Sequence, residues 1–158
     1  MHIRALADAD REGVERLIVE RWGEPIVVGR GRVWTPAELP GFAAFEDDRC
    51  VGLLTYEIEG DALEIVTIDA LVEGQGIGTA LLGAVEEVAR AQGCRRLRLV
   101  TTNNNLRALL FYQRAGFRLV ALMPGAVEES RKLKPSIPEL DAAGLPIRDE
   151  LHLELPLR

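Results

Sequence analysis

The chain has 158 residues and a formal net charge of −6 at pH 7, and 47% of its residues are hydrophobic. This length suffices for one hydrophobic core without disulfides or metals, so we expect residues 1–158 to form a single domain. The negative charge argues against a general surface for nucleic acid or for an anionic membrane.

The sequence offers no targeting or metal-binding signal. The first residues, MHIRALADAD, lack the apolar core of a signal peptide, and no apolar run is long enough to cross a bilayer. Cys50 and Cys94 have no metal-ligand spacing, and His2 and His152 lie far from both. We therefore expect a cytoplasmic protein that needs no metal ion and binds neither nucleic acid nor membranes.

The first half of the chain predicts a strand, a helix and a three-strand meander. Residues 2–6 have the pattern of a strand, and residues 8–22 carry apolar side chains at helical spacing up to Gly23. Proline and glycine in residues 24–40 predict a loop with about one helical turn. Three apolar runs separated by short polar turns then predict antiparallel strands: residues 41–47, 49–59 and 62–71.

The second half alternates helices and strands. A helix follows a glycine-rich stretch at 73–78 and ends near Gly93. The next elements are a strand, a helix and a strand, at residues 95–102, 105–116 and 117–123. Residues 124–147, rich in proline and charge, predict a long loop before a last strand at 148–157. The strand–helix–strand unit around the glycines implies a parallel crossover, with ligands at the carboxyl ends of its strands.

The glycine stretch has the features of a phosphate-binding turn. Gly74, Gly76 and Gly78 precede a helix start, where unpaired N–H groups and the helix dipole favour an anion. A P-loop would need a lysine, which is missing before Thr79. A dinucleotide-binding or methyltransferase-type loop would need an acidic residue after the next strand, and the sequence there reads RLRLVTTNNN. Those loops also follow the first strand of a parallel sheet, whereas this one follows a meander.

The sequence resembles the GNAT superfamily of acetyl-CoA-dependent N-acetyltransferases. EGQGIG matches the superfamily's Arg/Gln-x-x-Gly-x-Gly/Ala motif at Gly76 and Gly78, with Glu73 at the usual Arg or Gln position. NLRALLFYQRAGF supplies the second motif at its usual spacings. The resemblance covers residues 2 to about 122. It implies an α/β GNAT acyltransferase fold, with a central mixed sheet of about seven strands flanked by helices.

The resemblance also implies the function. Acetyl-CoA would be the co-substrate, and the acetyl group would pass to a primary amine of a small molecule, peptide or protein by direct transfer in a ternary complex. The protein would be a monomer or a homodimer. The alternative is a non-catalytic acyl-CoA-binding or sensor domain that keeps the fold, which Glu73 favours because an acid near a pyrophosphate is unfavourable unless it points to solvent.

The resemblance assigns the residues around the cofactor. Amides from Gln75 to Thr79 would bind the pyrophosphate, the strand edge near Ile68 would pair with the pantetheine amides, and Ala108 would let the cofactor lie against the second helix. The full set expected at the cofactor is Ile68, Leu71, Val72, Gly74, Gln75, Gly76, Ile77, Gly78, Thr79, Asn105, Ala108 and Phe111.

Two residues are expected to be catalytic, Tyr112 and Glu64. Asn105, Ala108 and Tyr112 share one helix face, and a phenol stays protonated at neutral pH, so Tyr112 can act as an acid toward the departing sulfur; the alternative is a packing role. Glu64 lies in an apolar strand, on the face of Val66 and Ile68 by simple alternation, where a raised pKa would suit a base. It is equally compatible with a solvent-facing or acceptor-binding charge. Tyr56, Glu57 and Asp69 are further candidates for the base.

Other residues have weaker assignments. Four aromatic residues fall where GNAT proteins build the acceptor pocket, and they are equally suited to the core: Trp22, Trp34, Phe42 and Phe45. The long segment after residue 130 could cover the acceptor site, although a solvated loop is favoured for Arg131, Lys132 and Lys134. His152 is expected to be an ordinary strand residue.

Overall fold

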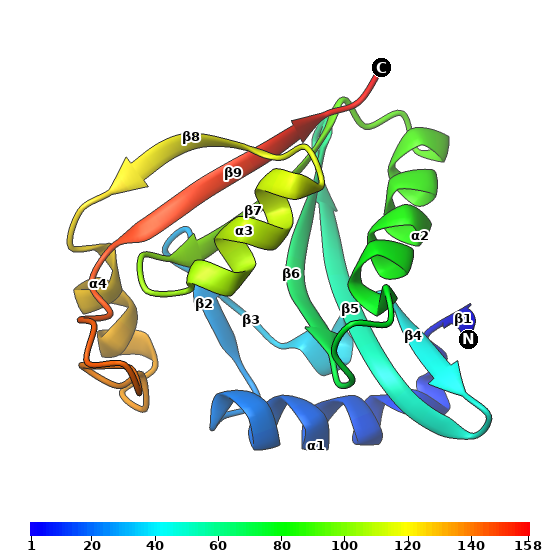
Figure 1. Cartoon of the computed structure of the whole chain (residues 1–158), viewed down its shortest axis with the longest axis horizontal. Coiled ribbons are helices and arrows are strands. Elements are labelled where there is room, and N and C mark those ends of the chain that lie inside the picture. Colours follow the sequence, from blue (N-terminus) through cyan, green and yellow to red (C-terminus); the bar gives the residue numbers. More distant parts are fainter.

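The centre of the protein is a seven-stranded mixed sheet with the strand order β1-β4-β5-β6-β7-β9-β8 (Figure 1). It is seen in a computed structural model that describes all residues from 1 to 158. The strands of this sheet are β1 (His2–Ala5), β4 (Gly41–Glu46), β5 (Arg49–Glu59), β6 (Ala62–Ala70), β7 (Arg96–Thr102), β8 (Arg118–Met123) and β9 (Glu150–Pro156). A separate two-stranded hairpin consists of β2 (Val27–Gly29) and β3 (Arg32–Trp34).

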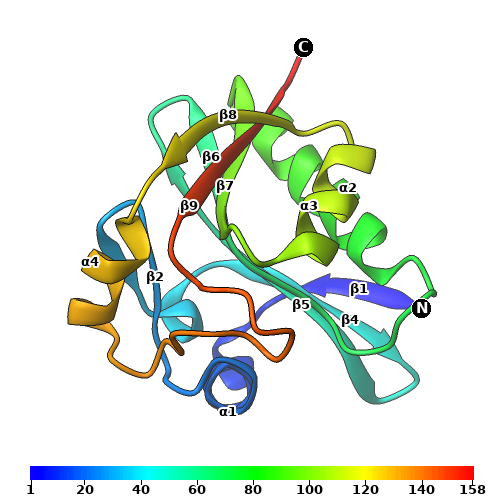
Figure 2. The same cartoon turned by 60° about the vertical axis from the view of Figure 1, so that its left-hand side comes forward.

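Helices cover both faces of the sheet. The α-helices are α1 (Arg11–Trp22), α2 (Ile77–Ala91), α3 (Leu106–Arg114) and α4 (Ala126–Leu133), and short 3-10 turns lie at Asp8–Asp10 and Pro36–Glu38. In Figure 2, α2 and α3 lie together on one side of the sheet, while α1 lies on the other. No helix combines the length and apolar character needed to cross a membrane.

The predicted meander is confirmed. Strands β4, β5 and β6 pair antiparallel in sequence order. Asp47 and Gly60 occupy the two tight turns between them with φ values of 54° and 61°, in the left-handed region that glycine and aspartate tolerate best. The first helix ends as predicted at Gly23, whose φ is 85° and whose amide donates to the carbonyl of Val19.

The predicted parallel crossover is also confirmed, but the two strands that it joins pair only briefly. Ala62–Glu64 of β6 pair with Arg96–Arg98 of β7, and there the ladder stops. Strand β7 continues in contact with β9 over its whole length. The two strands therefore diverge, as Figure 1 shows, and leave a V-shaped opening in the middle of the sheet.

A bulge in β6 changes which side chains share a face. Tyr56 pairs with Ile65 and Thr55 pairs with Thr67, so Val66 is an extra residue. Ile68 consequently packs against the core beneath α2, whereas Glu64 faces the β2–β3 hairpin. The prediction that Glu64 and Ile68 share a face is therefore wrong, because simple alternation ignores the bulge.

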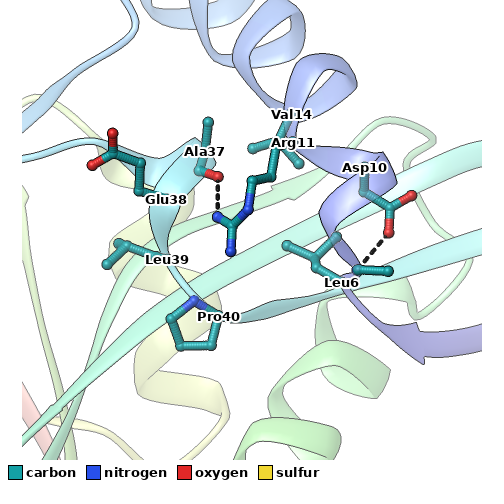
Figure 3. Close-up of a pocket in the computed structure, with 9 residues that line it drawn as sticks. Leu6, Asp10, Arg11, Val14, Ala37, Glu38, Leu39 and Pro40 are labelled. Carbon is teal, nitrogen blue, oxygen red and sulfur yellow. Dashed lines mark hydrogen bonds between the residues drawn. The ribbon is translucent and has the colours of Figure 1, made fainter.

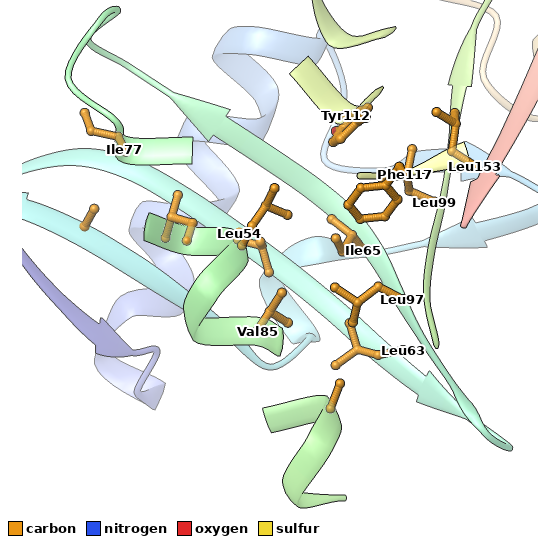
Figure 4. Close-up of a cluster of buried hydrophobic side chains, with 14 of the residues drawn as sticks. Leu54, Leu63, Ile65, Ile77, Val85, Leu97, Leu99, Tyr112, Phe117 and Leu153 are labelled. Carbon is orange, nitrogen blue, oxygen red and sulfur yellow. The ribbon is translucent and has the colours of Figure 1, made fainter. Parts of the chain in front are cut away.

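The main core lies between the sheet and the α2 and α3 helices. Figure 4 shows side chains from both helices and from the strands meeting there: Leu54, Leu63, Ile65, Ile77, Val85, Leu97, Leu99, Tyr112, Phe117 and Leu153. Each buried aliphatic or aromatic side chain contributes about 1.5–3 kcal/mol to the free energy of unfolding. A smaller cluster of Val14, Ile18 and Leu53 holds α1 against the opposite face. The sheet is thus covered by packed side chains on both of its faces.

Two segments expected to be loops contain regular structure. Residues 24–40 include the β2–β3 hairpin besides the expected helical turn, and Arg30 and Gly31 form its turn with positive φ. Residues 124–147 include α4, which buries Val127 and Ser130. Both elements bury only a few side chains, so their hydrophobic pattern is too short to stand out from the prolines and charges around it.

Candidate active site

The open edge of β6 is the first part of the candidate site. Beyond Glu64 no strand pairs with β6 on the side facing β7. Leu71 donates its amide to the carbonyl of Val51, 2.8 Å away, so this group points to β5 and is not free for a ligand. Because strand amides alternate in direction, Ile68, Ala70 and Val72 face the opening instead. Of the residues predicted on this edge, Ile68 and Val72 have available backbone groups and Leu71 does not.

A run of unpaired amides follows this edge. No amide from Val72 to Thr79 donates a hydrogen bond within the chain, and Ala80 is the first α2 amide with a helical partner, the carbonyl of Gly76 at 3.0 Å. Gly74 and Gly76 have φ values of 74° and 71°, which turn the backbone into the helix. The amides of Gln75 and Ile77 belong to this run. The loop and the helix start together form a concentration of donors suited to an anion.

Gly78 also has a packing role between two helices. A Cβ at this position would lie 2.9 Å from the ring of Phe111 on α3. The ring of Phe111 in turn packs edge-on against that of Tyr112, with 5.4 Å between the ring centroids. The missing side chain of Gly78 therefore lets α2 and α3 approach each other, and Phe111 fills the space.

The side chain of Glu73 is exposed to solvent and paired with an arginine. Its side chain is 72% exposed, and its Oε1 lies 2.6 Å from the guanidinium of Arg107 in the first turn of α3. Both groups are solvent-exposed, so the ion pair contributes little to stability. The position of the ion pair matters more, because the pair links the glycine loop to α3 across the opening. Arg107 also neutralises the charge of Glu73, which stands where Arg or Gln is usual.

The start of α3 borders the same opening. Asn105 caps the helix, since its Oδ1 accepts the amide of Ala108 at 3.3 Å. Ala108 packs partly against the core beside Tyr112. The cap fixes the first turn of α3, so the helix face predicted from the spacing of Asn105, Ala108 and Tyr112 is directed toward the sheet.

Tyr112 is buried, with 8% of its surface exposed. Phe111 and Phe117 pack edge-on against its ring, and its hydroxyl makes no hydrogen bond within the chain. Burial raises the pKa of Tyr112 above its usual range, and the negative charge of Asp69 raises this pKa further. The phenol is therefore fully protonated at neutral pH and has a proton to give.

Glu64 is buried between two arginines. Its Oε1 accepts from Nε of Arg30 at 2.6 Å and from Nε of Arg98 at 2.9 Å, whereas its Oε2 has no partner. Burial raises the pKa of Glu64, and the two guanidinium groups oppose this rise. Only 2% of the residue is exposed, so the solvent-facing alternative is wrong.

The other candidate bases differ in availability. Glu57 accepts hydrogen bonds from Arg32 and Trp34, which occupy both of its oxygens. Asp69 is buried, accepts from Arg21 at 3.0 Å, and keeps Oδ2 without a partner. Burial raises the pKa of Asp69 and also that of Tyr56. Asp69 is thus a second buried carboxylate with a free oxygen on the face of β6 that carries Glu64.

A cavity of about 300 Å³, here called the large pocket, lies where β6 and β7 separate. Its apolar lining comes from Trp22, Val27, Val28, Trp34, Ile65, Val66, Val100, Val127, Ile137, Pro138 and Ile147. Its polar lining comes from Glu64, Thr67, Thr101, Thr102, Asn104, Asn105, Ser130, Lys134, Ser136 and Glu150. This size and mixture are typical of small-molecule sites. Of the four aromatic residues considered from the sequence, Trp22 and Trp34 line this pocket, whereas Phe42 packs against the main core.

A second, small pocket lies between α1 and the Pro36–Glu38 turn (Figure 3). Two of its charged side chains are already paired: Arg11 donates to the carbonyl of Ala37 at 2.6 Å, and Asp10 accepts from the amide of Ala7 and from Arg4. These bonds hold the turn against α1, which gives this pocket a structural explanation.

Sequence analysis missed the charged residues that surround Glu64. Besides Arg30 and Arg98, the group includes Glu150, whose Oε1 accepts the Arg30 amide at 3.1 Å, and His152, which lies 2.7 Å from that oxygen. His152 is therefore part of a polar network and not an ordinary strand residue. The partners of Arg30 are 34 to 122 positions away in the sequence, so no local pattern could reveal the network.

The solvated-loop prediction for the segment after residue 130 is also wrong for two of its three charges. Arg131 is partly buried and donates to the carbonyls of Pro138 and Ile147, which folds the segment back on α4. Lys134 is 6% exposed and lines the large pocket. Lys132 does lie in solvent, beside Glu129.

Comparison with known proteins identifies the class of this fold. The model of the Acetyltransferase (GNAT) family matches residues 6–117, and the chain belongs to this family of acyltransferases. The protein YxbD of Bacillus subtilis (strain 168) is 42% identical over 154 residues, which are 97% of each chain.

Two solved structures share the fold. The IAA acetyltransferase from Bacillus cereus ATCC 14579 has a TM-score of 0.75 at 22% identity, over 99% of both chains. A GNAT family acetyltransferase from Elizabethkingia anophelis, with acetyl-CoA bound, has a TM-score of 0.71 at 18% identity, over 99% of this chain and 97% of its own. The expected mixed α/β fold with seven central strands is thus confirmed.

Proposed function

We propose that this protein transfers an acetyl group from acetyl-CoA to a primary amine, directly, within a ternary complex. The observation that carries the proposal is the set of free backbone groups that runs from the open edge of β6, apart from Leu71, to the start of α2. The amides of the pantetheine arm can pair with that edge, and the pyrophosphate fits the unpaired amides between Gly74 and Thr79. The acetyl-CoA bound to the Elizabethkingia anophelis protein of the same fold supports this assignment.

The proposed chemistry uses two side chains, those of Glu64 and Tyr112. When bound, acetyl-CoA supplies an activated acetyl group as a thioester. The acceptor nitrogen forms a bond to the acetyl carbon, the carbon–sulfur bond breaks, the nitrogen loses one proton and the sulfur gains one. We propose that Oε2 of Glu64 accepts the proton that leaves the nitrogen, directly or through water. The hydroxyl of Tyr112 donates the proton that the sulfur gains.

The test measures free thiol released from acetyl-CoA in the presence of a panel of primary amines, with mass detection of the acetylated product. We expect release that depends on both acetyl-CoA and the amine. Cofactor binding without release for any amine would favour the non-catalytic acyl-CoA-binding alternative.

Hydrogen exchange tests the binding mode independently of turnover. Coenzyme A should slow exchange at the amides of Ile68 and Val72, which face the opening. Leu71 is the internal control, because its amide is already bonded to Val51 and should change little. Equal protection of all three amides, or of none, would contradict pairing along this edge.

A further inference from the structure

The large pocket carries charges of opposite sign on separate walls. Glu64 and Glu150 lie on the sheet, on β6 and β9, while Lys134 follows the end of α4. Figures 1 and 2 both place α4 away from β6, on the far side of β2. Apolar side chains such as those of Trp22, Val28 and Ile137 line the space between. A ligand that fills the pocket therefore meets an acidic end, an apolar middle and a basic end.

The acidic end suits an N–H donor. The carboxylates of Glu64 and Glu150 are balanced by Arg30 and Arg98, so the cluster has little net charge. Oε2 of Glu64 nevertheless lacks a hydrogen-bond partner. A buried acceptor without a partner is costly, and an amine nitrogen in the pocket would satisfy it. The balanced charge also favours a neutral amine, which is the form that attacks a thioester.

The basic end consists of one lysine without an anion. Only 6% of the Lys134 residue is exposed, and no carboxylate oxygen lies within 4.0 Å of its ammonium. Glu24 is the acid that acts on it electrostatically, from beyond that distance, and its carboxylate already accepts the hydroxyl of Ser136. Burial of the side chain lowers the pKa of Lys134, because partial removal from water disfavours its charged form. A ligand carboxylate at this end would supply the missing partner.

We propose that the acceptor is a small apolar amino acid, whose amine lies at Glu64 and whose carboxylate pairs with Lys134. The proposal rests on the acetyl transfer proposed above and narrows its substrate class. A pocket of about 300 Å³ accommodates a molecule of this size, and the tryptophan and aliphatic lining suits an apolar body. Lys134 is thereby a specificity-determining residue.

The test compares acceptors that differ only at the carboxylate. Leucine, methionine, phenylalanine and tryptophan are each assayed against their own carboxamides. We expect at least one acid to be turned over with kcat/KM tenfold or more above that of its amide. In Lys134→Met this preference should disappear through a rise in KM of about tenfold or more for the acid, with kcat within twofold and the amide unaffected. Lys134→Arg should restore part of the preference, because it restores the charge.

The control is Lys132→Met, two positions earlier and on the solvent side of α4, which should leave all constants unchanged. Binding of the four N-acetyl amino acids and their amides to the protein loaded with coenzyme A gives a readout that needs no turnover. If no acid binds or reacts better than its amide, or if Lys134→Met affects acids and amides alike, the proposal is wrong. Turnover of the amides in that case would leave the acetyltransferase assignment intact, whereas no turnover of any amine would remove the assignment itself.

Discussion

Glu64 holds a carboxylate between two guanidinium groups and still leaves one oxygen without a partner. Each side chain of the site shows a similar combination of a fixed position and one free group. The ring of Tyr112 is held by two phenylalanines while its hydroxyl is unbonded, and Asp69 is held by Arg21 with Oδ2 free. Fixed side chains with unused hydrogen-bonding groups are what a catalytic site needs, because little reorganisation is required when the substrate arrives.

The first prediction concerns the proposed acid. Tyr112→Phe should lower kcat on the order of a hundredfold, because only the departing sulfur needs the phenolic proton. The ring packing stays the same and the hydroxyl has no internal partner, so the melting temperature and the Kd for coenzyme A should barely change. Steady-state rates and a thermal melt of the two proteins check this. A variant with full activity toward several amines would assign Tyr112 to packing.

A second prediction concerns the proposed base. Burial raises the pKa of Glu64, and the group works as a carboxylate, so kcat should fall as pH drops through a value above the usual glutamate range. Glu64→Gln should lower kcat a hundredfold or more, remove this acidic limb and regain rate at high pH, where more amine is neutral. Glu59→Gln, at an exposed carboxylate on β5, is the control and should keep the wild-type profile.

If Glu64 only attracts the substrate, the Gln variant should instead show a higher KM with an unchanged kcat. If neither constant moves, the proton leaves by another route, and Asp69 becomes the next carboxylate to test.

At the level of elements, the site depends on the contact between α2 and α3. Gly78 lets the ring of Phe111 approach α2, and Asn105 fixes the start of α3. The packing of Phe111 against Gly78 therefore positions α3, which carries Tyr112, relative to the loop amides at the start of α2. A change at this contact should alter cofactor binding and stability together.

Two glycines of α2 allow a matched test of this contact. Gly78→Ala should lower the free energy of unfolding by about 1 kcal/mol or more, because its Cβ would force Phe111 to move. Gly83→Ala, in the same helix with open space around it, should raise this free energy by up to about 1 kcal/mol through helix propensity. Urea unfolding measures both. Adding Phe111→Leu should recover part of the loss at position 78, and equal effects at the two glycines would contradict the steric explanation.

The elements that sequence patterns predict correctly are those with long apolar repeats. The α2 helix and the β4–β6 meander bury many side chains, so their period is visible. Sequence patterns do not reveal the β2–β3 hairpin and α4, because each of these elements buries few residues. The bulge at Val66 has no sequence signature, and it decides the direction of Glu64. Motif spacing located the cofactor edge, but contacts between distant residues define the large pocket.

For the whole molecule, the opening between β6 and β7 joins the two faces of the sheet. The face with α2 and α3 carries the free loop amides, and the other face carries the β2–β3 hairpin, α1 and the segment after α4 that surround the large pocket. In the proposed reaction, donor and acceptor therefore approach from opposite sides and meet where the sheet splits. Most of the elements that line the large pocket are therefore separate from the loop that carries the free amides.

The position of β9 between β7 and β8 has a consequence for the order in which the protein can be assembled. Strand β8 pairs only with β9, and it carries half-exposed apolar residues such as Leu119, Val120 and Leu122 even in the finished fold. During synthesis on the ribosome, β7 and β8 are complete well before residues 150–156 exist. Until then two strand edges with apolar side chains are open to pairing with other chains. Strand β9 must insert between β7 and β8, so the nascent chain exposes both of these edges until residues 150–156 have been synthesised and have paired.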